Sequence, residues 1–206
     1  MTYLPPKYDL RESVFFVGFM GAGKTSTARR LARTCGAASI DMDRYIERRE
    51  QCSVADIFAR GGEDLFRTIE TEILEELSHR EPLLISCGGG IVVNDESRKV
   101  LLKNGTVVYL RISADEAKAR ITNFASRPLF GDIENARRLN ADRAPMYEEV
   151  ADIVVDTAGK SVAEIAREVR RALVRRGVLC EKQSLLSRLS RRLRTRCVSG
   201  QVCWRI

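Results

Sequence analysis

A glycine-rich stretch carries the most specific chemical signal in the sequence. It reads Gly18-Phe19-Met20-Gly21-Ala22-Gly23-Lys24-Thr25 and matches the pattern G-x-x-x-x-G-K-[ST], in which glycines let successive backbone N–H groups point at phosphate oxygens. An apolar run, Val14–Val17, precedes it, and a helix-like stretch, Ser26–Ala32, follows it, as this motif requires. Lys24 is expected to reach the β- and γ-phosphates of a nucleotide, and the Thr25 hydroxyl to ligate Mg²⁺. The residues expected to contact the nucleotide here are Gly21, Ala22, Gly23, Lys24, Thr25 and Ser26.

Two carboxylates, Asp41 and Asp43, follow the next expected strand. Ligands of open α/β sheets bind at the carboxyl ends of the strands, so both side chains are expected beside the phosphate loop. One carboxylate can hold Mg²⁺ through water, while the other accepts a hydrogen bond from an attacking hydroxyl. The alternative for Asp43 is that it caps the helix that follows, a role that one residue can combine with catalysis.

An arginine lies between two glutamates at helical spacing: Glu63, Arg67 and Glu70 can share one helix face. The alternative is an ordinary surface ion pair, which contributes about 0.3–0.5 kcal/mol. Further along, Gly88–Gly90 follows the apolar run Leu83–Ile85. Three glycines at the end of a buried strand indicate a ligand pressed against the backbone, or else only a tight strand-to-helix turn.

Short apolar runs alternate with longer amphipathic stretches along the chain. The expected strands are Val14–Val17, Ala38–Ile40, Leu83–Ile85, Val107–Leu110 and Ile153–Val155. The expected helices are Lys24–Cys35, Arg44–Glu50, Val54–Ala59, Glu63–His79, Glu96–Lys103, Ala114–Asn123, Glu134–Glu149 and Ala163–Arg176. Strands that are apolar throughout are typical of parallel sheets covered on both faces. The pattern therefore predicts an α/β fold, with a five-stranded parallel sheet between two layers of helices.

The net charge of the 206-residue chain is +7, from 35 Lys and Arg against 28 Asp and Glu. Such an excess suggests nucleic acid or an acidic membrane surface as a partner. However, residues 170–206 hold eleven basic residues and one acid, Glu181, a net charge of +10 that leaves −3 for residues 1–169. The basic character therefore belongs to the C-terminal end, and we expect no nucleic acid partner for the main body of the chain.

The six cysteines have no CxxC pair, and with His79 as the single histidine a zinc site has little support. Reduced thiols in a cytoplasm are the simplest interpretation, with a disulfide among Cys180, Cys197 and Cys203 left open. The longest apolar run, Val14–Met20, is too short to span a bilayer, and Met1–Ser13 does not look like a secretory signal. We therefore expect a cytoplasmic protein with no membrane span.

Taken in order along the chain, these motifs resemble those of the shikimate kinase family. The resemblance is carried by the glycine-rich stretch and by Asp41-Met42-Asp43, Val54-Ala55-Asp56-Ile57-Phe58, Gly62-Glu63, Phe66-Arg67 with Glu70, Gly88-Gly89-Gly90, Arg127-Pro128-Leu129 and Arg143-Ala144-Pro145-Met146-Tyr147. It runs from about Ser13 to Arg176. It implies a P-loop kinase fold with a lid, and an enzyme that uses ATP and Mg²⁺ to phosphorylate the 3-hydroxyl of shikimate on the route to chorismate and the aromatic amino acids. The resemblance also implies a monomer whose partners are shikimate and ATP.

The resemblance assigns roles to individual residues. It implies that Arg67 and Arg143 bind the shikimate carboxylate, which guanidinium groups suit. It implies that Asp43 holds the ring hydroxyls and orients or deprotonates the 3-hydroxyl, while Gly88, Gly89 and Gly90 approach the ring. Asp41 matches the family's aspartate that contacts Mg²⁺ through water.

The resemblance also implies that two further arginines contact the nucleotide. Arg127 opens a lid at about residues 125–142 and would add positive charge over the transferring phosphate, so the catalytic set is Lys24, Asp43 and Arg127. Arg120 stands where the family stacks an arginine on adenine, and its alternative is a solvated position on a helix. Cys87 is expected to be a small buried apolar side chain rather than a redox switch.

The expected domain organisation is an N-terminal extension at 1–12, a kinase-like domain at 13–176 and a basic C-terminal extension at 177–206. The extension is either a solvated tail or a basic amphipathic helix that binds nucleic acid, anionic lipid or protein. We expect deletion after Arg176 to leave the kinetics nearly intact. Two alternative functions for the domain are a gluconate-type kinase and a homologue that binds ligands without catalysis.

Overall fold

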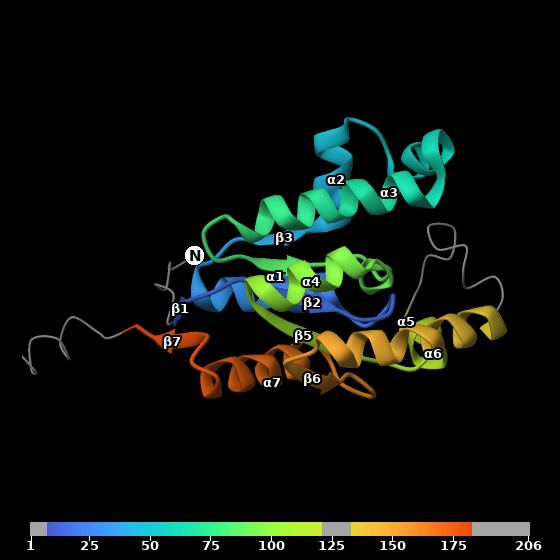
Figure 1. The fold of residues 1–206 in the computed structure, drawn as a ribbon. Coiled ribbons are helices and arrows are strands. Elements are labelled where there is room, and N and C mark those ends of the chain that lie inside the picture. Colours follow the sequence, from blue (N-terminus) through green and yellow to red (C-terminus); the bar gives the residue numbers. More distant parts are fainter. Residues whose placement is uncertain (1–7, 121–132, 183–206) are drawn as a thin grey trace, which may run out of the picture.

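The structure is a computed structural model, and it describes residues 8–120 and 133–182 (Figure 1). A five-stranded parallel sheet has the strand order β3-β4-β2-β5-β6. Its strands are β2 (Val14–Val17), β3 (Ser39–Asp41), β4 (Leu84–Ser86), β5 (Thr106–Arg111) and β6 (Ile153–Asp156). The predicted α/β fold is confirmed, because all five expected strands are present in parallel pairing.

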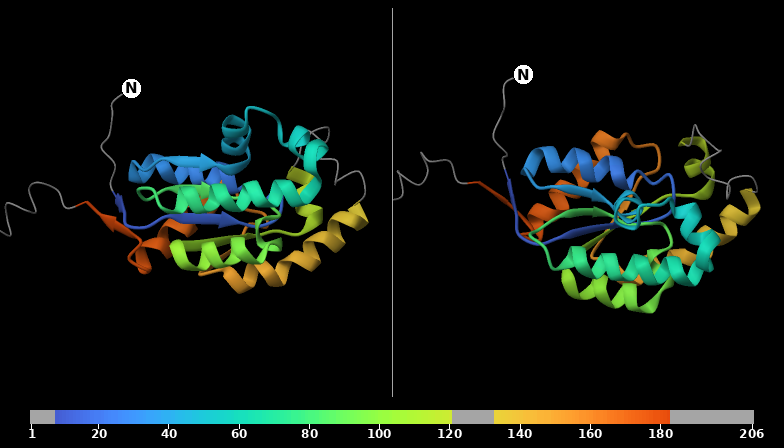
Figure 2. Two further views of the ribbon diagram at one scale, coloured as in Figure 1. Left: turned by 45° about the horizontal axis from the view of Figure 1, so that its top comes forward. Right: turned by 90° about the horizontal axis from the view of Figure 1, so that it is seen from above.

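Helices cover both faces of this sheet (Figure 2). On one face, α1 (Lys24–Cys35) packs against α7 (Val162–Arg175). On the other face lie α3 (Val54–Ser78), α4 (Asp95–Asn104) and α6 (Ile133–Val150). The remaining helical elements are α2 (Met42–Glu50), α5 (Ala114–Arg120) and the short 3₁₀ helix η1 (Ile91–Val93).

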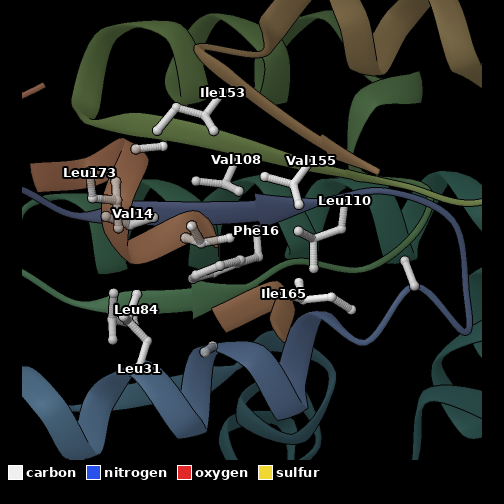
Figure 3. Close-up of a cluster of buried hydrophobic side chains, with 14 of the residues drawn as sticks. Val14, Phe16, Leu31, Leu84, Val108, Leu110, Ile153, Val155, Ile165 and Leu173 are labelled. Carbon is white, nitrogen blue, oxygen red and sulfur yellow. The ribbon is translucent and has the colours of Figure 1, made fainter. Parts of the chain in front are cut away.

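Two hydrophobic clusters fill the space between sheet and helices. Because successive side chains of a strand point to opposite faces, Phe16 enters one cluster and Phe15 the other. Figure 3 shows Phe16 beside Leu31 of α1 and Ile165 of α7 in the first cluster. The second cluster packs Phe15 against α3 residues such as Leu74. Burial on both faces explains why the strands are apolar at nearly every position.

A glycine pair shapes helix α3 where the sequence predicts two separate helices. Gly61 and Gly62 have non-helical backbone angles, with a φ of 68° at Gly62, so the element Val54–Ser78 consists of two helices joined at a kink, and the predicted separation is confirmed. Ser53 caps the N-terminus in a reciprocal capping box with Asp56. The segment before the glycines therefore leaves the axis of the main helix, and it lies over the carboxyl ends of the strands (Figure 1).

A second, two-stranded sheet lies outside the expected domain limits. Strand β1 (Tyr8–Leu10) pairs antiparallel with β7 (Leu179–Glu181), and the Arg11 amide donates to the Val178 carbonyl at 2.9 Å. Val178 and Leu179 are 5% and 1% exposed and belong to the first hydrophobic cluster. Folded structure therefore continues beyond Arg176, which argues against the expectation that a chain cut there keeps its kinetics.

Part of the expected lid and most of the basic extension, residues 125–132 and 183–206, lie outside the described residues, as does Arg127. The second half of the expected lid, residues 133–142, belongs to helix α6. In the part of the chain that the structure describes, no helix is long and apolar enough to cross a membrane.

Candidate active site

The glycine-rich stretch forms a loop between the end of β2 and the start of α1. Gly18 has a φ of 135°, and a Cβ there would lie 2.5 Å from the Leu110 carbonyl oxygen, so only glycine fits this approach to β5. Gly23 takes the left-handed conformation at the helix N-cap. The Lys24 ammonium donates to the carbonyl oxygens of Gly18 at 2.8 Å and Phe19 at 3.1 Å. The loop therefore wraps around its own lysine at the positive end of α1.

Three oxygen-bearing side chains meet beside this loop. The Thr25 hydroxyl donates to Asp41 Oδ2 at 2.7 Å and lies 2.9 Å from Ser86 Oγ. Thr25 lies in the first turn of α1, Asp41 ends β3 and Ser86 ends β4, so the parallel sheet brings them to one edge. Hard oxygen donors of this kind suit Mg²⁺, and Thr25 and Asp41 are the two residues that the sequence predicts for it.

The cap of helix α2 is Asp41 and not Asp43. Asp41 Oδ1 accepts a hydrogen bond from the Arg44 amide at 3.3 Å, at the N-cap position of α2. The alternative role of Asp43 as the helix cap is therefore wrong. Asp43 lies in the first turn of α2, is exposed, and lines the same cavity as Lys24.

Arg67 and Glu70 form a buried pair on the inner side of α3. Arg67 Nη1 donates to Glu70 Oε2 at 2.5 Å, and the two side chains are 14% and 1% exposed. Arg67 Nη2 also donates to Glu63 Oε1 at 2.9 Å, but Glu63 is 58% exposed. The interpretation as a surface ion pair therefore holds for Glu63 only, because Glu70 is fully enclosed.

Burial perturbs the ionisation of this pair. Burial raises the pKa of the Glu70 carboxyl, and the nearby Asp43 carboxylate raises it further. The positive charges of Arg67 and Arg143 lower this pKa, but the net shift is upward. Burial also lowers the pKa of Arg67, but the attraction to Glu70 and Glu63 outweighs this effect, so that pKa is raised. A second observation concerns Glu70 Oε1, which is buried without a hydrogen-bond partner in the described residues. The arginine stays charged while its buried carboxylate partner binds a proton more readily than usual.

The three glycines after β4 make room for these side chains. A Cβ on Gly88 would lie 2.6 Å from Glu70 Oε1 and 3.2 Å from Asp43 Oδ1. A Cβ on Gly90 would lie 2.2 Å from Arg67 Nη2. The glycines are therefore more than a tight turn, because two of them let charged groups approach the backbone closely.

The Gly89 carbonyl anchors helix α6 to the site. Arg143 Nη1 donates to this oxygen at 3.3 Å, and the Tyr147 hydroxyl donates to it as well. Burial raises the pKa of Tyr147, which keeps its hydroxyl protonated as a donor. Tyr147 also stacks on Tyr109 of β5 with ring centroids 5.0 Å apart. Arg143 is thus held at the rim of the cavity next to the glycines.

One cavity of about 610 Å³ joins these groups. On one side it is lined by Lys24, Thr25 and Asp41, and on the other by Arg67, Glu70 and Arg143. The further lining residues are Met20, Asp43, Glu47, Val54, Phe58, Phe66, Ser86, Cys87, Gly88, Gly89 and Gly90. A phosphate loop and a pair of arginines therefore face one shared space, with Asp43 at its wall.

Arg120 lies apart from this cavity. Its Nη1 donates to Thr157 Oγ1 at 3.3 Å, and its Nη2 donates to the carbonyl oxygens of Thr157 and, at 3.4 Å, Lys160. These residues form the loop between β6 and α7, so Arg120 is not the freely solvated side chain of the alternative interpretation. Its contact with adenine stays a prediction.

Several residues in or directly behind the cavity wall are absent from the predicted site. Ser86 and Tyr147 touch predicted residues directly, and Phe58 stacks on Phe66 at 4.9 Å to form an apolar wall. Tyr147 and Phe58 belong to motifs that carry the family resemblance, so the sequence contained a signal for both residues. For Ser86, the only signal in the sequence was its position at the end of a strand. Cys87 is 2% exposed with a thiol pKa raised by burial, which supports the predicted apolar role.

Comparison with known proteins identifies the family. A family model described as shikimate kinase matches residues 20–174, three quarters of the chain. The chain belongs to the shikimate kinase family. The shikimate kinase of Chromobacterium violaceum is 40% identical over 162 residues, which cover 77% of this chain and 88% of that protein. The shikimate kinase of Dehalococcoides mccartyi is 35% identical over 165 residues, with coverage of 79% and 94%.

Solved structures agree with this membership of the shikimate kinase family. A shikimate kinase from Acinetobacter baumannii in complex with shikimate superposes with a TM-score of 0.76 at 33% identity, covering 80% of this chain and 94% of that one. A gluconokinase from Sinorhizobium meliloti has a TM-score of 0.54 at 21% identity, covering 81% and 94%. The latter likeness shows a shared fold only, so it gives the gluconate alternative no support beyond the architecture.

Proposed function

We propose that the chain transfers the γ-phosphate of ATP to the 3-hydroxyl of shikimate, giving shikimate 3-phosphate and ADP on the route to chorismate. The observation that carries this proposal is the single cavity with Lys24 on one side and Arg67 and Arg143 on the other. A substrate with a carboxylate at one end and a hydroxyl at the other can span that space. Phosphoryl transfer needs mainly such positioning and the neutralisation of charge.

The phosphate loop supplies the positive charge. We propose that the backbone amides of Gly21, Ala22, Gly23 and Ser26, with the N-terminus of α1, bind the phosphates. Lys24 already lies inside the loop, bonded to two of its carbonyls, and it is proposed to turn to the β- and γ-phosphates. Its charge offsets the negative charge that moves during transfer.

Thr25 and Asp41 are proposed to hold Mg²⁺, Asp41 through water. Their oxygens lie 2.7 Å apart beside the phosphate loop, and a hydroxyl with a carboxylate is a donor set that this ion accepts. When bound with ATP, the ion neutralises phosphate charge. Ser86 donates to or accepts from Thr25 and keeps its hydroxyl oriented.

The opposite wall is proposed to bind shikimate. Arg67, held by Glu70, and Arg143, held by Gly89, are the two guanidinium groups for the carboxylate. The absence of side chains at Gly88, Gly89 and Gly90 lets the ring approach the backbone. Asp43 then accepts a hydrogen bond, and finally the proton, from the attacking hydroxyl.

Two arginines complete the proposed nucleotide site. Arg127, which lies outside the described residues, is proposed to cover the transferring phosphate from the lid. Arg120 is proposed to stack on adenine, and its bonds to Thr157 and Lys160 hold it beside the β6–α7 loop. We also propose a cytoplasmic monomer, in keeping with the free thiols of the four described cysteines.

A coupled ADP-release assay with a panel of acceptors tests the reaction. We expect ADP release with shikimate and none above background with gluconate. Phosphorylation of gluconate without phosphorylation of shikimate would select the gluconate-type alternative. ATP binding with no turnover on any acceptor would select the non-catalytic homologue.

Asp43→Asn tests the role of the proposed base. We expect kcat to fall by about 10²–10⁴-fold, because an amide cannot take the hydroxyl proton, while ATP binding persists. Asp64→Asn is the matched control, since Asp64 is exposed and does not line the cavity. Unchanged turnover in Asp43→Asn would refute the assignment.

A further inference from the structure

The face of the molecule formed by α1 and α7 carries seven arginines that form no ion pair with any described residue. They are Arg29, Arg30, Arg33, Arg167, Arg170, Arg171 and Arg175. Elsewhere in the described chain, arginines such as Arg49, Arg98, Arg111 and Arg137 have carboxylate partners. Single arginines elsewhere, such as Arg44 and Arg60, also lack an ion pair among the described residues, but on α1 and α7 this holds for all seven arginines.

Few carboxylates compensate this charge. Helix α1 contains no acidic residue, and α7 has two, Glu164 and Glu168, which share a groove with Arg167, Arg171 and Arg175 but form no ion pair with them. Glu164 accepts from the Ser161 hydroxyl at 2.7 Å, and Glu168 pairs with Lys160 at 2.6 Å. Because like charges that share a surface repel one another, the face favours an anionic partner that spreads over both helices.

The same face also presents apolar groups. A groove of about 380 Å³ between α1 and α7 is lined by three arginines, Arg30, Arg167 and Arg170, and by Leu31, Thr34, Ala163 and Ala166. Two further side chains of α7, Val162 and Val174, are 37% and 40% exposed. Arginines with apolar side chains between them match a surface that offers both phosphate groups and hydrocarbon.

The chain continues from this face with a similar composition. Strand β7 packs against α7 and ends one residue before Lys182. Residues 183–206 contain six arginines and no acid, together with large apolar residues that include Leu185, Leu189, Leu193 and Trp204. A nucleic acid would satisfy the arginines but leave the leucines and valines without a function, so the observations favour lipid.

We propose that the α1/α7 face, defined by the seven arginines above, docks on the surface of a bilayer that contains anionic phospholipid. The guanidinium groups bind phosphate head groups, and the apolar side chains between them contact the acyl boundary. The candidate active site lies at the carboxyl ends of the strands, and β7 lies at the opposite end of the molecule (Figure 1). The groove between α1 and α7 shares no lining residue with the cavity, so docking through this face leaves the cavity open to small substrates.

Co-sedimentation of the full chain with vesicles tests this proposal. We expect binding to vesicles of phosphatidylcholine and phosphatidylglycerol at 3:1, little binding to pure phosphatidylcholine, and loss of binding in high salt. The variant Arg167→Glu with Arg171→Glu should weaken binding by at least about tenfold, because two attractive charges become repulsive. Arg30→Glu with Arg33→Glu makes the same test on α1, should the α7 variant fail to fold.

The matched control is Arg60→Glu with Lys103→Glu, which reverses two exposed charges on α3 and α4, on the other side of the sheet from this face. It should bind vesicles like the unaltered chain. Equal binding by the face variants and the control would overturn the proposal, and so would tighter binding to a 20-nucleotide RNA than to the anionic vesicles. Kinase activity is measured on every variant, so a failure of lipid binding is separate from a failure of the proposed reaction.

Discussion

Arg67 and Glu70 lie one helical turn apart on α3 and are joined by a 2.5 Å hydrogen bond, with the Glu70 side chain 1% exposed. The arginine lies against Gly90, at the wall of the cavity, while the second oxygen of Glu70 faces Gly88 and Asp43. One proposed substrate-binding charge therefore depends on a carboxylate that has no access to solvent.

Replacing Glu70 by alanine should destabilise the fold and weaken shikimate binding. Arg67 would keep a mostly buried charge without its buried partner, which costs about 3 kcal/mol of unfolding free energy. The KM for shikimate should rise more than kcat falls, because the guanidinium loses its orientation. Urea denaturation and steady-state kinetics measure both effects. Glu63→Ala removes the exposed partner of the same arginine and should cost less than about 1 kcal/mol, and an equal loss in the two variants would contradict this interpretation.

The stability of the protein should depend on pH through Glu70. Burial raises the pKa of Glu70, so the folded protein holds this proton at a pH where the unfolded chain has released it. The unfolding free energy should therefore fall as pH rises from the ordinary value of 4.5 through the raised pKa, and the stabilisation is complete only below that window. Urea denaturation at a series of pH values should show a steeper fall for the unaltered chain than for Glu70→Gln. Parallel curves would show that Glu70 titrates normally.

Gly90→Ala should act on shikimate binding through Arg67. The added methyl group would lie 2.2 Å from Arg67 Nη2, and the flexible side chain must move away and loosen its bond to Glu70. We expect a rise of about tenfold or more in the KM for shikimate, with a smaller effect on the KM for ATP. A double-mutant cycle supplies the control: in an Arg67→Ala background, Gly90→Ala should add almost nothing. Additive effects of the two changes would place the cause elsewhere.

The two sides of strand β7 should differ sharply as points of truncation. A chain ending at Arg176 loses Val178 and Leu179, which are buried, and leaves β1 without its pairing strand. Each such side chain contributes about 1.5–3 kcal/mol on burial, so the melting temperature should drop by several degrees or more. A chain ending at Lys182 keeps β7 and should retain its melting temperature and kcat. Thermal unfolding and the ADP-release assay distinguish the two, and identical behaviour would mean that β7 contributes no stability.

Much of the fold follows from local patterns. The glycine-rich stretch and the runs Val14–Val17 and Val107–Leu110 identify a phosphate loop on a parallel sheet, because backbone conformation and burial on two faces restrict residue type at each position. Strand β1 and strand β7 were not predicted. Each has three residues, and their pairing depends on a contact between the two ends of the folded chain.

The sequence by itself determined which residue types were available for phosphates, a metal ion and a carboxylate, and in what order they occur. Only the tertiary structure decided that Glu70 is enclosed while Glu63 is exposed, that Ser86 meets Thr25 and Asp41, and that Arg120 bonds to the β6–α7 loop. The physical reason is that burial and pairing are set by neighbours distant in the chain. Helical spacing places Glu63 and Glu70 equally well beside Arg67, but the packing of α3 over the sheet removes only one of them from water.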